Sequence, residues 1–110
     1  MYRKVRKLPY NRRNLLRYGK GVIIMISKQS VVRCESGLHN KQATYFIQKA
    51  NEFRSSIWIE VDNRKINAKS LLGVLSMGVI QGTAITLIAD GVDEEAAVEE
   101  LTQMLQVDVF

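Results

Sequence analysis

The chain has 110 residues, of which 46% are hydrophobic and 25% are charged, and its formal net charge is +5 at pH 7. This length and composition are typical of one compact domain and exclude a chain that is disordered along its whole length. The single cysteine, Cys34, excludes an internal disulfide framework and favours a reducing cytoplasmic setting, in which we expect it to pack as a small apolar residue.

Residues 1–24 differ in charge from the rest of the chain. They hold 8 of the 16 basic residues and no acidic residue, whereas the other 86 residues carry 8 basic and 11 acidic groups and so a net charge of −3. The segment shows no period of 2 or 3.6 residues, so its sequence predicts neither a strand nor a helix. The positive charge of the protein therefore belongs to its N-terminal segment, and the body is mildly acidic.

Three interpretations of this segment are open. It is a basic arm that contacts nucleic acid or an anionic membrane, a tail without function, or untranslated sequence read as protein. We favour the third, because the codons for GKGV are purine-rich, like a bacterial ribosome-binding site, and lie just upstream of Met25. We expect a basic extension over 1–24, disordered or a start-site artefact, and a folded domain over 25–110.

The first half of the body predicts a strand followed by a helix. MISKQSVVRCE is rich in β-branched residues and indicates a strand over 26–33. SGLH then turns the chain. The helix is expected over 40–52, because its apolar residues follow the spacing of one buried helical face: Ala43, Phe46, Ile47, Ala50 and Phe53.

The second half predicts a hairpin, a short helix, a strand and a final helix. Alternating Ile57, Ile59 and Val61 indicate a half-buried strand, and Asp62-Asn63 is a turn pair before the returning segment RKINA. The expected later features are Ser70 as N-cap of a short helix closed by Gly78, the strand TAITLIAD, and Asp93 as cap of a helix that buries Ala97, Val98, Leu101, Met104 and Leu105. The order β-α-β-β-α-β-α favours an α+β fold, with a four-stranded antiparallel sheet covered by helices on one face.

His39 is the only histidine in the chain, and it precedes the predicted first helix. A helix N-terminus carries free N–H groups and partial positive charge, so a phosphoryl group on the imidazole would be stabilised there. Neutral imidazole is a nucleophile near neutral pH, which suits a phosphoryl carrier, and Lys41 would add positive charge. On this chemistry alone, a structural role for His39 as a cap or partly buried residue stays open. The sequence shows no metal site, because His39 has no partner ligands.

Two blocks of sequence, GLH…A and NAKSLLGVLSMGVIQGTAITLIADGVDEEAAVEEL, resemble the HPr family, the histidine-containing phosphocarrier proteins of the bacterial sugar phosphotransferase system. The resemblance covers residues 25 to 106. It implies the HPr open-faced sandwich with three helices, and a carrier rather than an enzyme, without a cofactor. His39 would take a phosphoryl group from enzyme I and pass it to the sugar-specific enzymes II. Ser70 matches the serine that an ATP-dependent kinase phosphorylates in many members. The residues expected to contact phosphate or partners are Asn40, Lys41, Gln42, Phe46, Leu71, Leu72 and Leu75. A place in the core stays open for some of the apolar ones, equally so for Leu72 and Leu75.

The catalytic loop departs from the family pattern H-[AP]-R-P-A, since this chain has H-N-K-Q-A. Lys41 replaces an arginine and cannot form a bidentate fork with phosphate, while Gln42 replaces a rigid proline. An alternative is therefore a regulatory relative that acts through Ser70 phosphorylation, by an HPr kinase/phosphorylase, and through binding to a catabolite-control transcription regulator, with weak or no transfer at His39.

A third hypothesis, a small nucleic-acid-binding module, is disfavoured because the acidic body lacks a basic patch with interleaved aromatic residues. No apolar run is long enough for a membrane-spanning helix or a signal-peptide core. We expect a cytoplasmic protein that does not insert into a membrane.

Overall fold

The computed structural model describes residues 13–18 and 21–108, with side chains described from Met25 onward. Within these residues, eight elements follow one another: β1 (Arg13–Tyr18), β2 (Gly21–Val31), α1 (Asn40–Asn51), β3 (Ser56–Val61), β4 (Arg64–Asn67), α2 (Leu71–Ser76), β5 (Ala84–Asp90) and α3 (Glu94–Met104). From Met25 onward this is the predicted order β-α-β-β-α-β-α.

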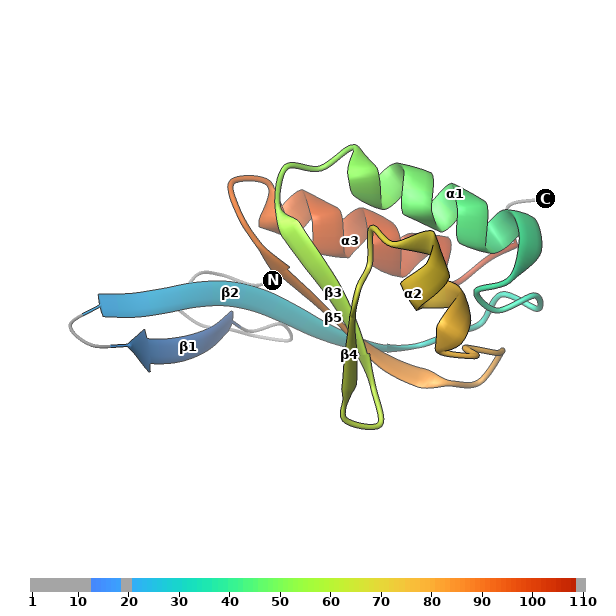
Figure 1. Ribbon diagram of the computed structural model, residues 1–110, viewed down its shortest axis with the longest axis horizontal. Coiled ribbons are helices and arrows are strands. Elements are labelled where there is room, and N and C mark those ends of the chain that lie inside the picture. The colour runs from blue at the N-terminus through green and yellow to red at the C-terminus, as the bar shows by residue number, and fades with distance from the viewer. Residues whose placement is uncertain (1–12, 19–20, 109–110) are drawn as a thin grey trace.

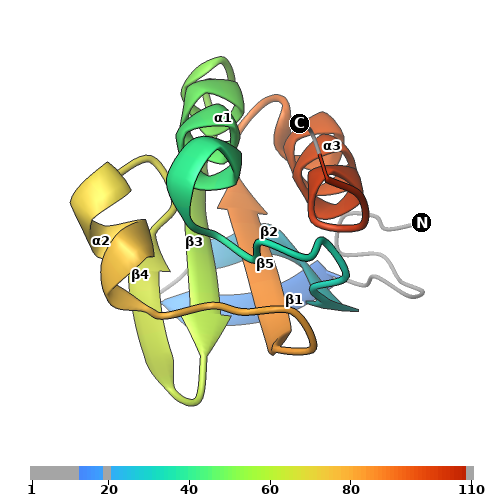
Figure 2. The same cartoon turned by 90° about the vertical axis from the view of Figure 1, so that its right-hand side faces the viewer.

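The strands form one antiparallel sheet in the order β1-β2-β5-β3-β4. The four strands β2 to β5 are the predicted four-stranded sheet, and all three helices cover one face of it (Figures 1 and 2). Helix α3 packs on β2 and β5, whereas α2 packs on β4 and contacts α1. The core lies between the two layers and includes Ile85 and Leu87 of β5 as well as Ile57 and Ile59 of β3, which the period-2 pattern placed on the buried face.

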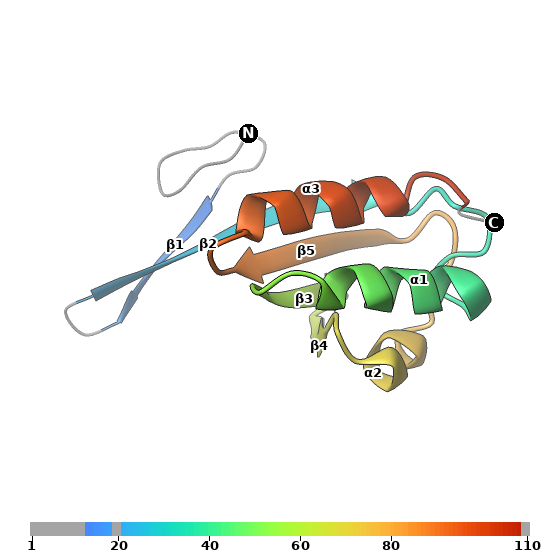
Figure 3. The same cartoon turned by 90° about the horizontal axis from the view of Figure 1, so that it is seen from above.

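The sheet extends further toward the N-terminus than the sequence predicted. Strand β2 covers Gly21–Val31 instead of 26–33, and β1 pairs with its first half, from Arg13↔Ile26 to Tyr18↔Gly21. Only Ile26–Val31 of β2 pairs with β5, so the β1–β2 hairpin projects from the body (Figures 1 and 3). Residues 1–12 and 19–20 lie outside the described residues. The domain boundary at residue 25 and the start-site hypothesis stay predictions.

The turns follow the chemistry of their residues. Asp62 and Asn63 have φ of 49° and 68° and join β3 to β4 in a two-residue hairpin whose last pair is Val61↔Arg64. A positive φ at both central residues is typical of a type I′ turn, whose twist matches that of the strands. Gly78 follows α2 with φ of 64°, as expected of the residue that ends a helix.

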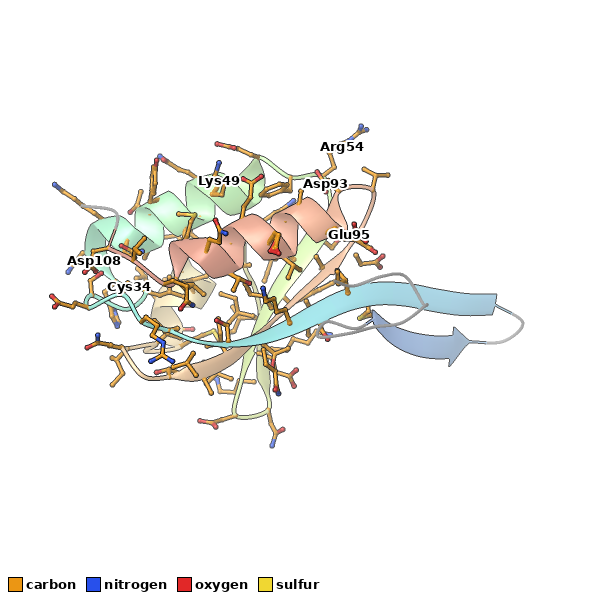
Figure 4. All side chains as sticks on the ribbon, turned by 180° about the vertical axis from the view of Figure 1, so that it is seen from behind. Cys34, Lys49, Arg54, Asp93, Glu95 and Asp108 are labelled. Carbon is orange, nitrogen blue, oxygen red and sulfur yellow. The ribbon has the colours of Figure 1, made fainter. Side chains whose placement is uncertain are left out.

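Asp93 occupies the N-cap position of α3, but its side chain makes no cap hydrogen bond. Its carboxylate instead accepts the N–H of Arg54 at 2.8 Å and the N–H of Ser55 at 2.9 Å, as well as the Ser55 hydroxyl. The predicted cap position is therefore confirmed, but the side chain has another role: Asp93 ties the start of α3 to the loop before β3 (Figure 4). Burial would raise the pKa of Asp93, but the hydrogen bonds from Ser55 and Arg54 outweigh it and lower the pKa.

Candidate functional site

His39 is the N-cap residue of α1 and has an extended backbone, with φ of −137° and ψ of 164°. Its side chain makes no cap hydrogen bond and is half-buried. The imidazole therefore does not cap the start of the helix, so the capping role that the sequence left open for the side chain is excluded. The backbone does contribute to the first turn, because the carbonyl of His39 accepts the N–H of Ala43 at 3.2 Å.

The loop before His39 is held in place by its backbone. Gly37 has φ of 63°, and a Cβ on it would overlap the carbonyl oxygen of Val79 and lie 2.7 Å from Cα of Ile80. The next residue, Leu38, is buried and donates its N–H to the same Val79 carbonyl at 3.0 Å. Glycine is therefore required here, because it allows both the left-handed backbone and the close approach of the segment before β5.

Asn40, the first residue of α1, also has a positive φ, of 51°. Few residues other than glycine adopt this conformation, and asparagine is among those that tolerate it best. The Asn40 side chain is exposed beside His39. The sequence predicted Asn40 at the site without predicting its backbone conformation.

His39 lies at the edge of an open groove of about 740 Å³ between α1 and α2. The groove is lined by His39, Asn40, Lys41, Thr44, Tyr45, Gln48, Leu71 and Leu75. The structure thus brings the expected histidine, lysine and two leucines of α2 into one depression. Three further lining residues were not predicted from the sequence, although helical spacing places them on the turns of α1 that follow Lys41: Thr44, Tyr45 and Gln48.

The apolar residues expected at the docking surface divide into two groups. Leu71, Leu72 and Leu75 are exposed by 43%, 80% and 39%, so they are available to a partner. Phe46 is fully buried in the core, and its predicted role as a docking contact is wrong. The reason is its place in the i, i+3, i+4 stripe of α1, which faces the sheet, whereas its neighbour Tyr45 faces the groove and is 43% exposed.

Ser70 is the N-cap of α2, as the sequence predicted. Its hydroxyl oxygen accepts the N–H of Gly73 at 3.1 Å, and its side chain stands next to the exposed leucines of α2. The hydroxyl thus satisfies one of the free N–H groups at the start of this short helix.

Gln42 and Lys41 have different environments although they are neighbours. Lys41 is exposed and lines the groove, which suits a charge partner for a phosphate on His39. Gln42 is only 3% exposed, and its side-chain amide donates to the carbonyls of Met104 and Val107 at 2.8 and 3.2 Å. Its side chain therefore serves to join α1 to the end of α3, a contact between distant segments that no local pattern reveals.

A second hollow, of about 580 Å³, lies on the other side of His39. The residues that line it are all of polar or charged type: Glu35, Ser36, His39, Asn40, Lys41, Gln42 and Asp108. Behind the loop, Cys34 is 1% exposed and belongs to the core, as expected of a small apolar residue. Burial raises the pKa of the Cys34 thiol, which makes it a poor nucleophile.

The described residues contain no group of three or more histidine, cysteine or acidic side chains placed to hold a metal ion. In the same part of the chain, no helix has both the length and the apolarity that crossing a membrane requires.

Comparison with known proteins shows one family. Residues 26–106 match the family model described as "PTS HPr component phosphorylation site". The chain is 42% identical over 85 residues to the HPr-like protein Crh of Bacillus subtilis, an alignment that covers 77% of this chain and 100% of Crh.

Solved structures agree. The phosphocarrier protein HPr of Bacillus anthracis is 38% identical, with a TM-score of 0.74 over 74% of this chain and 98% of that one. The solution structure of Crh, the "Bacillus subtilis Catabolite Repression HPr", is 42% identical, with a TM-score of 0.59 over 73% of this chain and 95% of that one. The family model, the curated relative and the shared fold agree with the histidine at the start of α1 and the capping serine at the start of α2. This chain belongs to the HPr family of phosphocarrier proteins.

Proposed function

We propose that this protein is a phosphocarrier of the phosphoenolpyruvate-dependent sugar phosphotransferase system, which accepts a phosphoryl group on His39 from enzyme I and passes it to enzymes II. The observation that carries the proposal is the placement of His39: its imidazole stands at the N-terminus of α1, makes no cap hydrogen bond, and borders an open apolar groove. A nucleophile, a place for an anion and a surface for a partner therefore meet at one residue.

The chemistry needs a nitrogen that attacks phosphorus as the bond from phosphorus to the donor breaks. The phosphohistidine that results is an anion, which the partial positive charge of the α1 N-terminus and the ammonium group of Lys41 stabilise. Because the phosphoryl group must leave again, the moderate stabilisation by one lysine, instead of a bidentate arginine, is compatible with transfer.

Transfer between proteins also needs a docking surface that several partners share. Leu71, Leu72 and Leu75 expose apolar area beside the groove that contains His39. Apolar side chains around a reactive group are what an interface requires, since their burial supplies affinity while the polar rim sets orientation.

The test is phosphoryl transfer with purified components. The protein is mixed with phosphoenolpyruvate, magnesium and enzyme I, and its intact mass is measured before and after brief acid treatment. We expect an added phosphate that acid removes, and that His39→Ala abolishes while Ser70→Ala does not. An unlabelled wild-type protein, in a reaction where another HPr is labelled, would refute the carrier function.

A second candidate function is favoured by the likeness to Crh and by the position of Ser70. Here the protein is a regulatory relative, phosphorylated on Ser70 by an HPr kinase/phosphorylase, that binds a catabolite-control transcription regulator. A phosphate on Ser70 would place roughly two negative charges beside Leu71 and Leu72, at the start of α2, where it changes the surface without opposing the helix. Incubation with ATP and the kinase should give an acid-stable phosphate that Ser70→Ala removes.

A further inference from the structure

The side chain of Gln42 caps a helix other than its own. Its amide nitrogen Nε2 donates to the carbonyl of Met104 at 2.8 Å and to that of Val107 at 3.2 Å, 62 and 65 residues further along the chain. The last carbonyls of a helix lack an intrahelical N–H partner, and Gln42 satisfies one of them, that of Met104, from the first turn of α1. We call residues 104–108 the C-terminal clip.

The clip also holds the chain on the other side of His39. The carbonyl of Leu105 accepts the N–H of Cys34 at 3.0 Å, and the carboxylate of Asp108 accepts the N–H of Glu35 at 2.9 Å. Figure 4 shows Asp108 and Cys34 close together at the end of the molecule where α1 begins. The clip is therefore bonded to the chain both before and after His39.

From this double attachment we propose that Gln42 is a positioning residue for His39, which acts through the C-terminal clip to fix where the phosphoryl acceptor stands. The inference rests on the proposed phosphocarrier function and deepens it, since it identifies a residue that sets the geometry of that site. Gln42 lies three residues after His39, in the first turn of α1. If its hydrogen bonds to the clip are lost and this turn moves, the movement reaches the imidazole through a short stretch of backbone.

The family pattern has a proline where this chain has Gln42, and the two residues make the first turn of α1 rigid in different ways. Proline stiffens a first turn by fixing its own φ, but it has no donor with which to reach the clip. Gln42 leaves its φ free and obtains rigidity from two hydrogen bonds to the main chain of the C-terminal clip. Transfer of a phosphoryl group depends on this rigidity, because a misplacement of about 1 Å lowers a rate by up to about 100-fold.

The test compares two glutamines of similar chemistry. Gln42→Met keeps the length and volume of the side chain and removes both donors. The matched control is Gln106→Met, because the Gln106 amide anchors the same clip to Ser30 and Val31 of β2, away from His39. Three quantities are measured for each full-length variant: the kcat and KM of phosphorylation by enzyme I, the melting temperature, and the NMR signals of the His39 imidazole.

We expect Gln42→Met to lower kcat about ten-fold or more with KM changed less than about two-fold, and to shift the His39 ring signals. Gln106→Met should change both clearly less, because the bonds of Gln42 to the clip remain, although both variants lower the melting temperature. Equal kcat values and unshifted ring signals for Gln42→Met would overturn the inference, as would equal effects of the two variants. If the wild-type protein takes no phosphate, the proposed function fails, and the ring signals alone then decide whether Gln42 positions His39.

Discussion

Leu72 is the most exposed leucine of the α2 surface, and truncating it tests the docking surface without disturbing the core. Its exposed fraction is 80%, so Leu72→Ala removes little packing from the folded protein. Leucine and alanine differ by three carbon atoms, each worth about 0.8 kcal/mol when buried. Burial of the exposed four-fifths against a partner therefore contributes about 2 kcal/mol, and its loss should weaken binding about 20- to 30-fold.

The assay is the dissociation constant of the complex with enzyme I, measured by calorimetry, together with the melting temperature of the free protein. Val92→Ala is the matched control, since Val92 is 85% exposed and lies in the turn between β5 and α3, at the opposite end of the helix layer from the start of α1 (Figure 3). Both variants should melt within about 2 °C of the wild type. A dissociation constant changed less than about three-fold by Leu72→Ala, or equally by both variants, would refute the placement of the surface on α2.

Three further predictions concern stability and reactivity. Gly37→Ala should lower the free energy of unfolding by about 3 kcal/mol and Gly78→Ala by about 1 kcal/mol, as measured by urea unfolding. Both glycines have a left-handed backbone, with φ of 63° and 64°, but only at Gly37 would an added Cβ overlap a neighbour. Since the hydrogen bonds from Ser55 and Arg54 outweigh burial and hold the pKa of Asp93 below its ordinary 3.8, its stabilising contribution is present above that pH and is lost as the pH falls through the lowered pKa. Unfolding at several pH values should show this loss, and Asp93→Asn should lack it. Burial raises the pKa of Cys34 above its ordinary 9.0, so its thiol should react with a maleimide about 100-fold more slowly in the folded protein than in denaturant.

Local patterns predicted the body of the fold because each pattern has a local cause. The period of 2 in Ile57, Ile59 and Val61 and the stripe of Ala43 and Phe46 on α1 follow from which side of the backbone faces the core. The turn residues and the cap at the start of α2 were predictable for the same reason. Strand β1 was not, because its segment has no clear alternation and its pairing with β2 depends on a neighbour that local patterns do not specify.

The candidate site was predicted less completely, because its contacts join distant segments. The resemblance placed Phe46 at the docking surface although its own periodicity placed it in the core, and the structure agrees with the periodicity. The carboxylate of Asp93 satisfies the loop before β3, and the amide of Gln42 satisfies the end of α3. Residue type shows that such side chains have hydrogen bonds to make, but only the fold determines with which partner.

The divergent loop H-N-K-Q-A is better explained as an alternative construction than as a decayed one. A loop that had decayed structurally would show strained backbone or unsatisfied polar side chains. Asn40 instead occupies a position with φ of 51°, where asparagine is tolerated better than the alanine of the family pattern, and the Gln42 amide makes two hydrogen bonds. Lys41 keeps a positive charge at the groove. Each change thus fits its place in the structure, so the loop is a stable one, and this geometry is compatible with the phosphoryl acceptor proposed at His39.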